Sequence, residues 1–118
     1  MTSRRVETTG VAASGDHGGP DKWLIDTGSG YDLVGRNDVP GWAMDSMLED
    51  SSPIDLHTAN GITTVDKTVS LQVMGLMEAV KPLVLQSTPA VLSVGKRCME
   101  EGWSFVWNAG ENPWLVSP

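Results

Sequence analysis

The stretch Trp23-Leu24-Ile25-Asp26-Thr27-Gly28-Ser29-Gly30 decides the fold. Its three apolar residues are followed at once by small and polar residues with strong turn chemistry. A short apolar run bounded in this way predicts a buried strand that ends at a tight loop. Asp26 would leave the strand at that loop. Gly28 would let backbone amides approach the carboxylate, and Ser29 could hydrogen-bond to its outer oxygen.

The chemistry that suits such an aspartate is hydrolysis by a pair of carboxylates. One carboxylate must be ionised to activate a water molecule, and the other must be protonated to donate to the carbonyl oxygen. Two carboxylates held about 3 Å apart cannot both ionise, so they share one proton. Asp26 is therefore the candidate catalytic residue, with Thr27, Gly28 and Ser29 as its active-site loop.

Two downstream features complete the pattern. Two β-prone runs, 54–58 and 62–65, flank Ala59-Asn60-Gly61, and Asn-Gly is a strong hairpin turn because both residues accept positive φ. A second apolar run, Val91-Leu92-Ser93-Val94, begins about 65 residues after Asp26. It is followed by a predicted short helix over 95–101, by Gly102 as its C-terminal cap, and by an alternating strand over 103–107.

The remaining segments also favour an all-β domain. Thirteen glycines and seven prolines predict many turns. Further strands are expected over 31–34, along the alternating stretch 65–73, over 80–85 at a sheet edge because of Pro82, and over 114–116. Residues 44–48 are expected to form one helical turn. Residues 1–21 are predicted to be a flexible lead-in, and residues 22–118 the folded domain.

From about Lys22 to Trp107 the chain resembles the retropepsin-like aspartic proteases, in particular those of copia-type retrotransposons. The resemblance rests on Asp26-Thr27-Gly28-Ser29, on the glycine-containing hairpin, and on Val91-Leu92-Ser93-Val94 with the helix, glycine and aromatic strand that follow. It implies an acid-protease half-barrel with one short helix, active as a homodimer.

The resemblance also implies roles for particular residues. Asp26 would be catalytic, Thr27 would hydrogen-bond across the dimer axis, and Gly28 would offer its backbone to substrate. Ala59, Asn60 and Gly61 would form the substrate-binding flap tip, and Val91, Leu92 and Ser93 would support the catalytic loop. Retroviral relatives carry an acid where this chain has Gly30, and an Arg-Asp pair where Lys96-Arg97 follows Gly95. The ion pair that braces the retroviral dimer is therefore not expected, and how this dimer is held stays open.

The function implied is an aspartic endopeptidase. Because the chain holds one Asp-Thr-Gly and is too short for two lobes, the site requires a homodimer with one Asp26 from each copy. Its substrate would be a polypeptide, presumed to be a retrotransposon-like polyprotein, and no cofactor or metal is expected. One alternative is a non-catalytic retropepsin-like module that dimerises and binds peptides. Another is a small structural β-domain with a chance motif, which predicts a stable monomer.

Composition excludes several other classes of protein. A net charge of −7 argues against nucleic acid as a partner, since phosphate binding needs clustered positive charge. A chain with one cysteine, Cys98, has no internal disulfide, and no apolar run is long enough to cross a membrane. Two histidines without a cysteine cluster make zinc binding improbable. An intracellular, cytoplasmic location is the default expectation.

Overall fold

The computed structural model describes residues 5–7, 19–20, 22–44, 48–58, 61–73, 75–76 and 78–118. Within these ranges the chain is mostly β-strand, which confirms the all-β class. The strands are β1 (Arg5–Glu7), β2 (Leu24–Asp26), β3 (Leu33–Gly35), β4 (Leu48–Thr58), β5 (Gly61–Thr68), β6 (Leu71–Val73), β7 (Glu78–Val80), β8 (Leu83–Leu85), β9 (Val91–Ser93), β10 (Ser104–Val106) and β11 (Trp114–Val116). The helical segments are η2 (Arg36–Asp38), α1 (Gly41–Met44) and α2 (Val94–Glu100).

The main sheet has the strand order β2-β9-β3-β8-β5-β4. The sheet is mixed. Strand β2 pairs with β9 in parallel, β3 pairs with β8 in parallel, and β3 and β9 are antiparallel. The parallel register places Ile25 beside Leu92 and Asp26 beside Ser93. Segments 67 residues apart in the chain therefore meet at the end of β2, as the resemblance implied for the supporting run.

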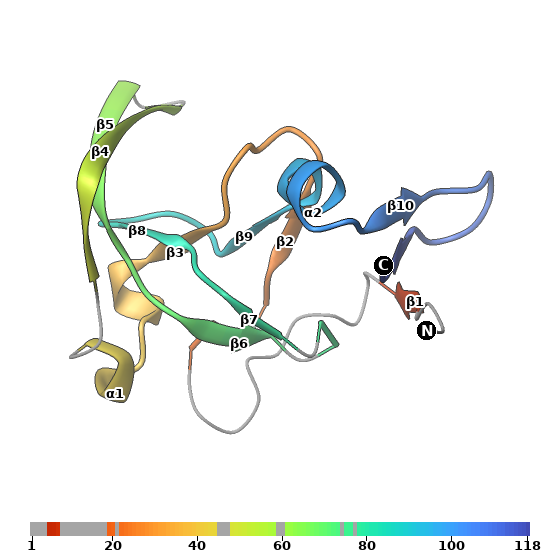
Figure 1. Cartoon of the computed structure of the whole chain (residues 1–118), viewed down its shortest axis with the longest axis horizontal. Helices are drawn as coiled ribbons and strands as arrows, with labels where there is room; N and C mark the ends of the chain where they lie inside the picture. Colours follow the sequence, from red (N-terminus) through yellow and green to blue (C-terminus); the bar gives the residue numbers. More distant parts are fainter. Residues whose placement is uncertain are drawn as a thin grey trace.

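Strands β4 and β5 form a long hairpin that stands at one side of the molecule (Figure 1). Gly61 has φ of 114°, the positive value that the Asn-Gly turn predicted. Along the hairpin, Ile54, Leu56 and Val65 pack on Leu83 and Leu85 in a small cluster of their own. Strand β5 pairs with β8 at Thr68 and Leu83, so the hairpin is joined to the sheet near its base.

The principal core lies on the other part of the sheet. It collects buried side chains from β3, α1, β6, β7, β8, β9, β11 and the segments between them, and those less than 2% exposed include Val34, Val69, Leu92 and Leu115. Trp23 and Trp103 are also buried in it, so both tryptophans help to build the core. Among the described residues, no helix is long and apolar enough to cross a bilayer.

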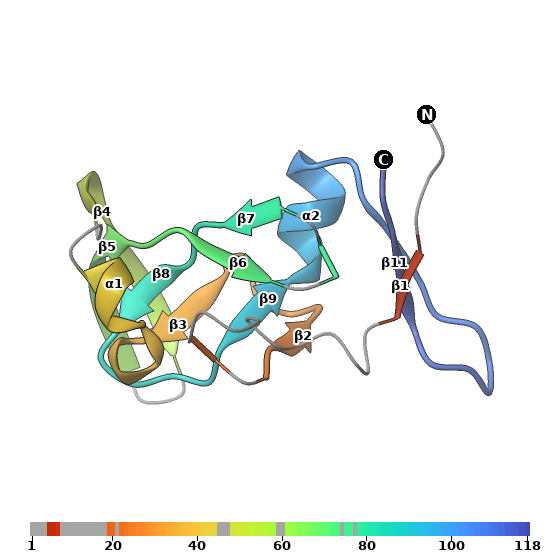
Figure 2. The ribbon, with the colours of Figure 1, turned by 90° about the horizontal axis from the view of Figure 1, so that it is seen from below.

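The terminal strands make a separate three-stranded sheet, β1-β11-β10, at the far side of the molecule from the hairpin (Figure 2). Strand β1 lies within the segment 1–21, where sequence patterning placed a lead-in. Its order has two sources: antiparallel pairing with β11, and the Arg5 guanidinium, which lies 5.6 Å from the Trp114 ring centre. Patterning missed this strand because three residues carry no periodic signal.

Other boundaries also differ from expectation. The single edge strand predicted over 80–85 is wrong: β7 ends at Val80, and β8 lies inside the main sheet between β3 and β5. Pro82 lies between the two strands and is fully buried. Because it has no N–H, it cannot continue the hydrogen bonding of β7 with β6, and the chain passes into β8 of the main sheet. Most of the helical turn predicted over 44–48 falls on residues 45–47, outside the described ranges; Met44 ends α1, and Leu48 begins β4.

Leu92 offers a test of the core. It is 1% exposed in the principal core, so Leu92→Ala is expected to lower the free energy of unfolding by about 2–5 kcal/mol. Met99→Ala, at a side chain 86% exposed on α2, should change it by less than about 0.5 kcal/mol. Urea denaturation of both variants measures this, and equal losses would contradict the assigned core.

Candidate active site

Asp26 is the last residue of β2, and its half-buried carboxylate is held by its own loop. The Gly28 N–H donates to Asp26 Oδ1 at 2.7 Å. A Cβ atom at position 28 would lie 3.3 Å from the same oxygen, so a side chain there would crowd the contact. The expectation that glycine lets the backbone approach the carboxylate is confirmed.

Ser29 does not take the role expected of it. Its hydroxyl donates to the Tyr31 carbonyl at 2.7 Å and accepts from the Tyr31 N–H at 3.3 Å. The predicted hydrogen bond from Ser29 to the Asp26 carboxylate is therefore wrong in this structure. The reason is local: a serine hydroxyl two residues before a backbone group closes a turn on it.

Ser93 fixes the loop from behind. Its hydroxyl donates to the Ser29 carbonyl at 2.5 Å and accepts from the Lys96 N–H at 3.0 Å, which caps helix α2. Ser93 is fully buried, so this hydroxyl has no competing water. One side chain therefore joins the loop after Asp26 to the start of α2. This gives a physical basis to the supporting role predicted for Val91, Leu92 and Ser93, of which the first two are also buried.

A buried ion pair also holds Ser93 in its position behind the Asp26 loop. Arg97 Nη1 and Nη2 lie 2.6 and 2.9 Å from the two carboxylate oxygens of Asp32, and both side chains are 1% exposed. Asp32 Oδ1 also accepts from the Ser93 N–H at 2.7 Å, and Arg97 Nη1 donates to the Ser93 carbonyl at 3.0 Å. Such two-pronged arginine–carboxylate contacts fix geometry as well as adding energy.

Sequence reasoning missed this pair. The sequence pattern gave Asp32 no role and treated Lys96-Arg97 only as a departure from the retroviral Arg-Asp pair. The sequence held a signal that each charge lies near the core, though not which two charges pair: Asp32 directly precedes the apolar residues Leu33 and Val34, and Arg97 lies one helical turn after Ser93. A charge so close to buried positions needs a partner of opposite sign.

Two adjoining hollows lie between the Asp26 loop and the hairpin. The larger, about 550 Å³, is lined by Asp26, Gly28, Ser29, Leu33, His57, Thr63 and the segment 85–89. Asp26 is the only carboxylate among these lining residues. The smaller, about 300 Å³, shares Gly28, Ser29, Leu33 and His57 and continues to Tyr31 and Asp55. Together they form a groove that passes Asp26.

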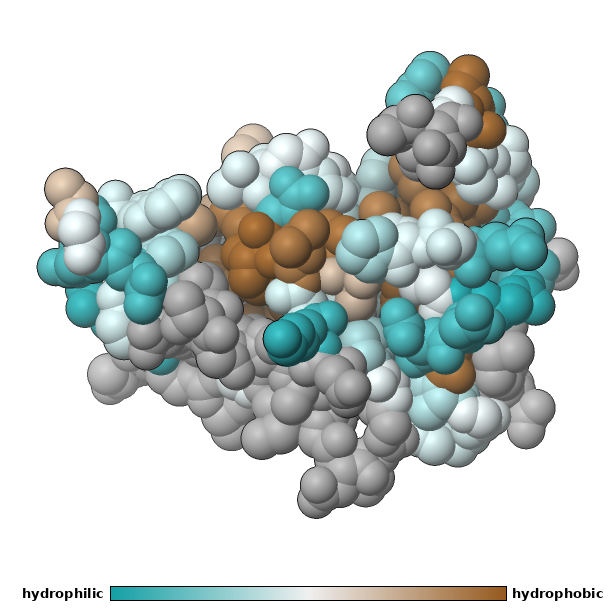
Figure 3. Space-filling view, turned by 180° about the vertical axis from the view of Figure 1, so that it is seen from behind, coloured by the Kyte–Doolittle hydropathy of each residue, from teal (hydrophilic) through white to brown (hydrophobic). Residues whose placement is uncertain are grey.

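The surface around this groove is partly apolar. In Figure 3 the hairpin rises above the body at the upper right, with apolar surface beneath it and a second apolar area near the centre of the same face. Leu24 and Ile62 are 55% and 65% exposed, which is high for large aliphatic side chains. Exposed apolar surface beside a groove is typical of a face that binds a peptide or another protein.

The structure brings some of the predicted site residues together at the groove and leaves others outside the described residues. Asp26, Gly28 and Ser29 line the groove, and Thr27 is exposed on the same loop. Of the flap-tip residues, Gly61 is placed at the end of the hairpin, whereas Ala59 and Asn60 lie outside the described residues. His57, on β4, lines both hollows. In the described part of the chain, no three His, Cys, Asp or Glu side chains are grouped to hold a metal ion.

The buried pair predicts a large effect of neutralising one partner. Asp32→Asn leaves the Arg97 charge buried without its counter-ion and is expected to cost about 3–5 kcal/mol of folding free energy. Replacing both, as Asp32→Leu with Arg97→Met, should recover much of that loss because no charge stays buried. Denaturant titration compares the three proteins. A loss below about 1 kcal/mol in Asp32→Asn would show that the pair does not hold the fold.

Glu101, just after α2, predicts a pH effect. Partial desolvation raises the pKa of its carboxyl above the ordinary 4.5, the charges of Glu78 and Asp32 add to this, and those of Arg97 and Lys96 oppose it. A raised pKa in the fold favours the protonated form, so the associated stability is present below pH 4.5 and is lost as the pH rises through the raised value. The melting temperature of Glu101→Gln relative to that of the parent should therefore increase as the pH rises above 4.5. A difference in melting temperature that stays constant between acid and neutral pH would contradict this.

Comparison with known proteins identified no relative of this chain. No protein-family model, no curated protein and no solved structure matches the chain. The resemblance to retropepsin-like proteases therefore rests on the residues of the chain themselves. What the site does must be argued from the groove, the loop that carries Asp26, and the network behind it.

Proposed function

We propose that this chain is one half of a retropepsin-like aspartic endopeptidase, a half-barrel that works as a homodimer. The observation that carries the proposal is the placement of Asp26: the end of a strand, on a glycine loop, facing a groove under a long hairpin. Ser93 and the Asp32–Arg97 pair brace that loop, so the carboxylate is held before substrate arrives.

The need for a second copy follows from the count of carboxylates. Acid-base hydrolysis of a peptide by carboxylates needs two, and the hollow at Asp26 is lined by one. Strand β2 ends the order of the main sheet, so the described sheet has no further strand beside Asp26. Leu24 and Thr27 are exposed on this side. A copy related by a two-fold axis would bring a second Asp26 and bury Leu24.

In the proposed dimer the two Asp26 carboxylates share one proton. The ionised carboxylate removes a proton from a water molecule, whose oxygen attacks the peptide carbonyl carbon. The protonated carboxylate donates to the carbonyl oxygen and gives a tetrahedral diol. Transfer of a proton to the amide nitrogen then breaks the C–N bond and releases an acid and an amine. The reaction needs water and no covalent intermediate.

The groove suits an extended polypeptide as substrate. It runs from Tyr31 and Asp55, past Asp26, to the segment 85–89, and the hairpin lies over it as a flap. A segment in this position meets exposed backbone at the loop and at the hairpin, which suits recognition through main-chain hydrogen bonds. We propose a retrotransposon-like polyprotein as the natural substrate.

Mutation of Asp26 tests the proposal. The parent chain should cleave members of a diverse peptide library at mildly acidic pH. Asp26→Asn should lower the rate by at least about 10²–10⁴-fold, because the amide cannot exchange the proton. Asp38→Asn, at an exposed residue of η2, is the matched control and should cleave as the parent does. Mass spectrometry of the products supplies the rates.

The oligomeric state separates the alternatives. Sedimentation equilibrium should show a monomer–dimer exchange, with activity that rises more steeply than protein concentration. A dimer that binds peptides without cleaving any would favour the non-catalytic binding module. A chain that stays monomeric at high concentration and binds no peptide would leave a structural β-domain and reject the protease.

A further inference from the structure

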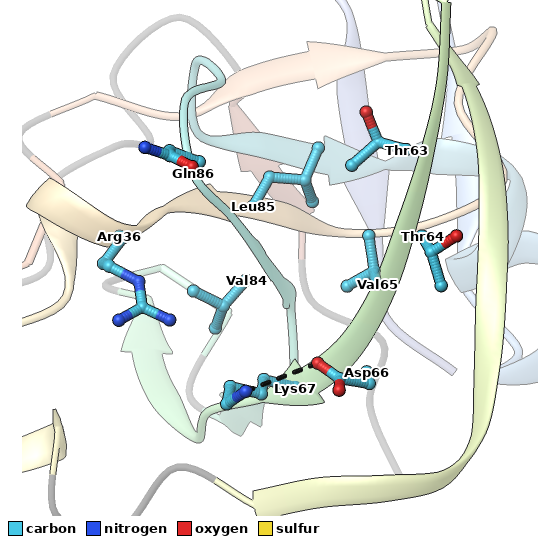
Figure 4. Close-up of a pocket in the computed structure, with 9 residues that line it drawn as sticks. All are labelled: Arg36, Thr63, Thr64, Val65, Asp66, Lys67, Val84, Leu85 and Gln86. Carbon is cyan, nitrogen blue, oxygen red and sulfur yellow. Dashed lines mark hydrogen bonds and ion pairs between the residues drawn. The ribbon is translucent and has the colours of Figure 1, made fainter.

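A third hollow lies at the base of the hairpin, outside the proposed catalytic groove. It has a volume of about 390 Å³ and opens where β5 leaves β8 (Figure 4). Val65 and Leu85 point toward one another, whereas Val84 lies on the other side of β8, next to Arg36 (Figure 4). All three side chains are buried, so most of the open surface of the hollow is polar. Two cations border it: Arg36, from the segment after β3, and Lys67, from β5.

Both cations are available to a ligand. The Arg36 side chain is exposed and makes no ion pair or hydrogen bond within the described part of the chain. Lys67 has one ion pair, 3.5 Å long, with Asp66, its neighbour in the chain. The two side chains of that pair are 37% and 44% exposed, so it contributes little and is easily exchanged for a stronger partner.

The charge of this hollow departs from that of the molecule. The chain carries a net charge of −7, yet two cations and one anion line this hollow. Cations that line one concave surface together raise the local concentration of anions there. The planar guanidinium of Arg36 can donate two parallel hydrogen bonds, and the ammonium of Lys67 adds a point charge.

We propose that this hollow is a binding site for a phosphate-type dianion, held between Arg36 and Lys67. A dianion with several oxygens can satisfy both cations at once, whereas a single carboxylate neutralises one of them. No step of the proposed hydrolysis uses either residue, so the site stands independently of the proposed function.

Occupancy would restrain the hairpin. Arg36 belongs to the body and Lys67 to the hairpin, which pairs with β8 at Thr68 and Leu83 and packs on it through Val65 and Leu85. An anion bridging the two cations adds a further contact between the hairpin and the body. The hollow also shares Thr63, Leu85 and Gln86 with the hollow at Asp26, so the two sites are adjacent.

Titration of the ¹⁵N-labelled chain with inorganic phosphate at constant ionic strength tests the site by NMR. Saturable shifts are expected at the amides of Thr63 to Lys67 and Val84 to Gln86. Arg36→Gln and Lys67→Gln should each raise the dissociation constant at least about tenfold, since each removes a charge-assisted contact. Lys22→Gln, at an exposed lysine outside the hollow, should leave it unchanged.

Three results would overturn the proposal. The first is a set of shifts that grow linearly and are reproduced by sodium chloride. The second is an affinity that does not depend on Arg36 and Lys67. The third is a succinate titration that saturates as tightly as phosphate, which would assign the hollow to carboxylates instead. None of these readouts requires cleavage, so failure here is distinguishable from failure of the proposed protease.

Discussion

The contact between Asp32 and Arg97 is the constraint on which the site depends. Both side chains are withdrawn from water, so neither charge could stay where it is without the other. Through Asp32 the pair holds the Ser93 N–H, and through Arg97 it holds the Ser93 carbonyl. Ser93 in turn holds the carbonyl of Ser29, three residues beyond Asp26. The position of the candidate catalytic carboxylate is thus set by a charge pair that never meets the groove.

Rigidity and freedom are divided between two parts of the molecule. The Asp26 loop lies between β2, β9 and α2, where parallel pairing, the cap of α2 and the ion pair all converge. The hairpin has its own small cluster and a narrow connection to β8. This division suits an enzyme that must hold a carboxylate within a fraction of an ångström and also admit a polypeptide.

Sequence alone predicted the local features of this arrangement well. The strand before Asp26, the positive φ of Gly61, the helix after Ser93 and the glycine after that helix were all readable, because each depends on a few adjacent residues. The ion pair was not, since it joins residues 65 apart and nothing in the pattern around Arg97 identifies its partner. The predicted hydrogen bond from Ser29 to Asp26 was wrong for a local reason. The prediction came from the motif and did not consider the backbone of Tyr31, two residues away, which binds the Ser29 hydroxyl instead. Strand β8 moved inside the sheet because tertiary pairing, not the presence of Pro82, decides which strand is an edge.

The departures from the retroviral pattern can now be reconsidered in physical terms. The acid expected near Gly30 is absent, but Asp32 supplies a carboxylate two residues later, and Arg97 of α2 meets it within the same chain. The pair is buried inside one copy, so it cannot also brace a second copy across an interface. If the chain dimerises as proposed, the contact must come from surfaces that one copy leaves exposed. Among the exposed large apolar side chains, Leu24 on the outermost strand of the main sheet is the nearest to Asp26 in the chain. Burial of apolar surface at that strand would then couple dimer formation to completion of the carboxylate pair, because the residue that drives association lies two positions from the residue that needs a partner.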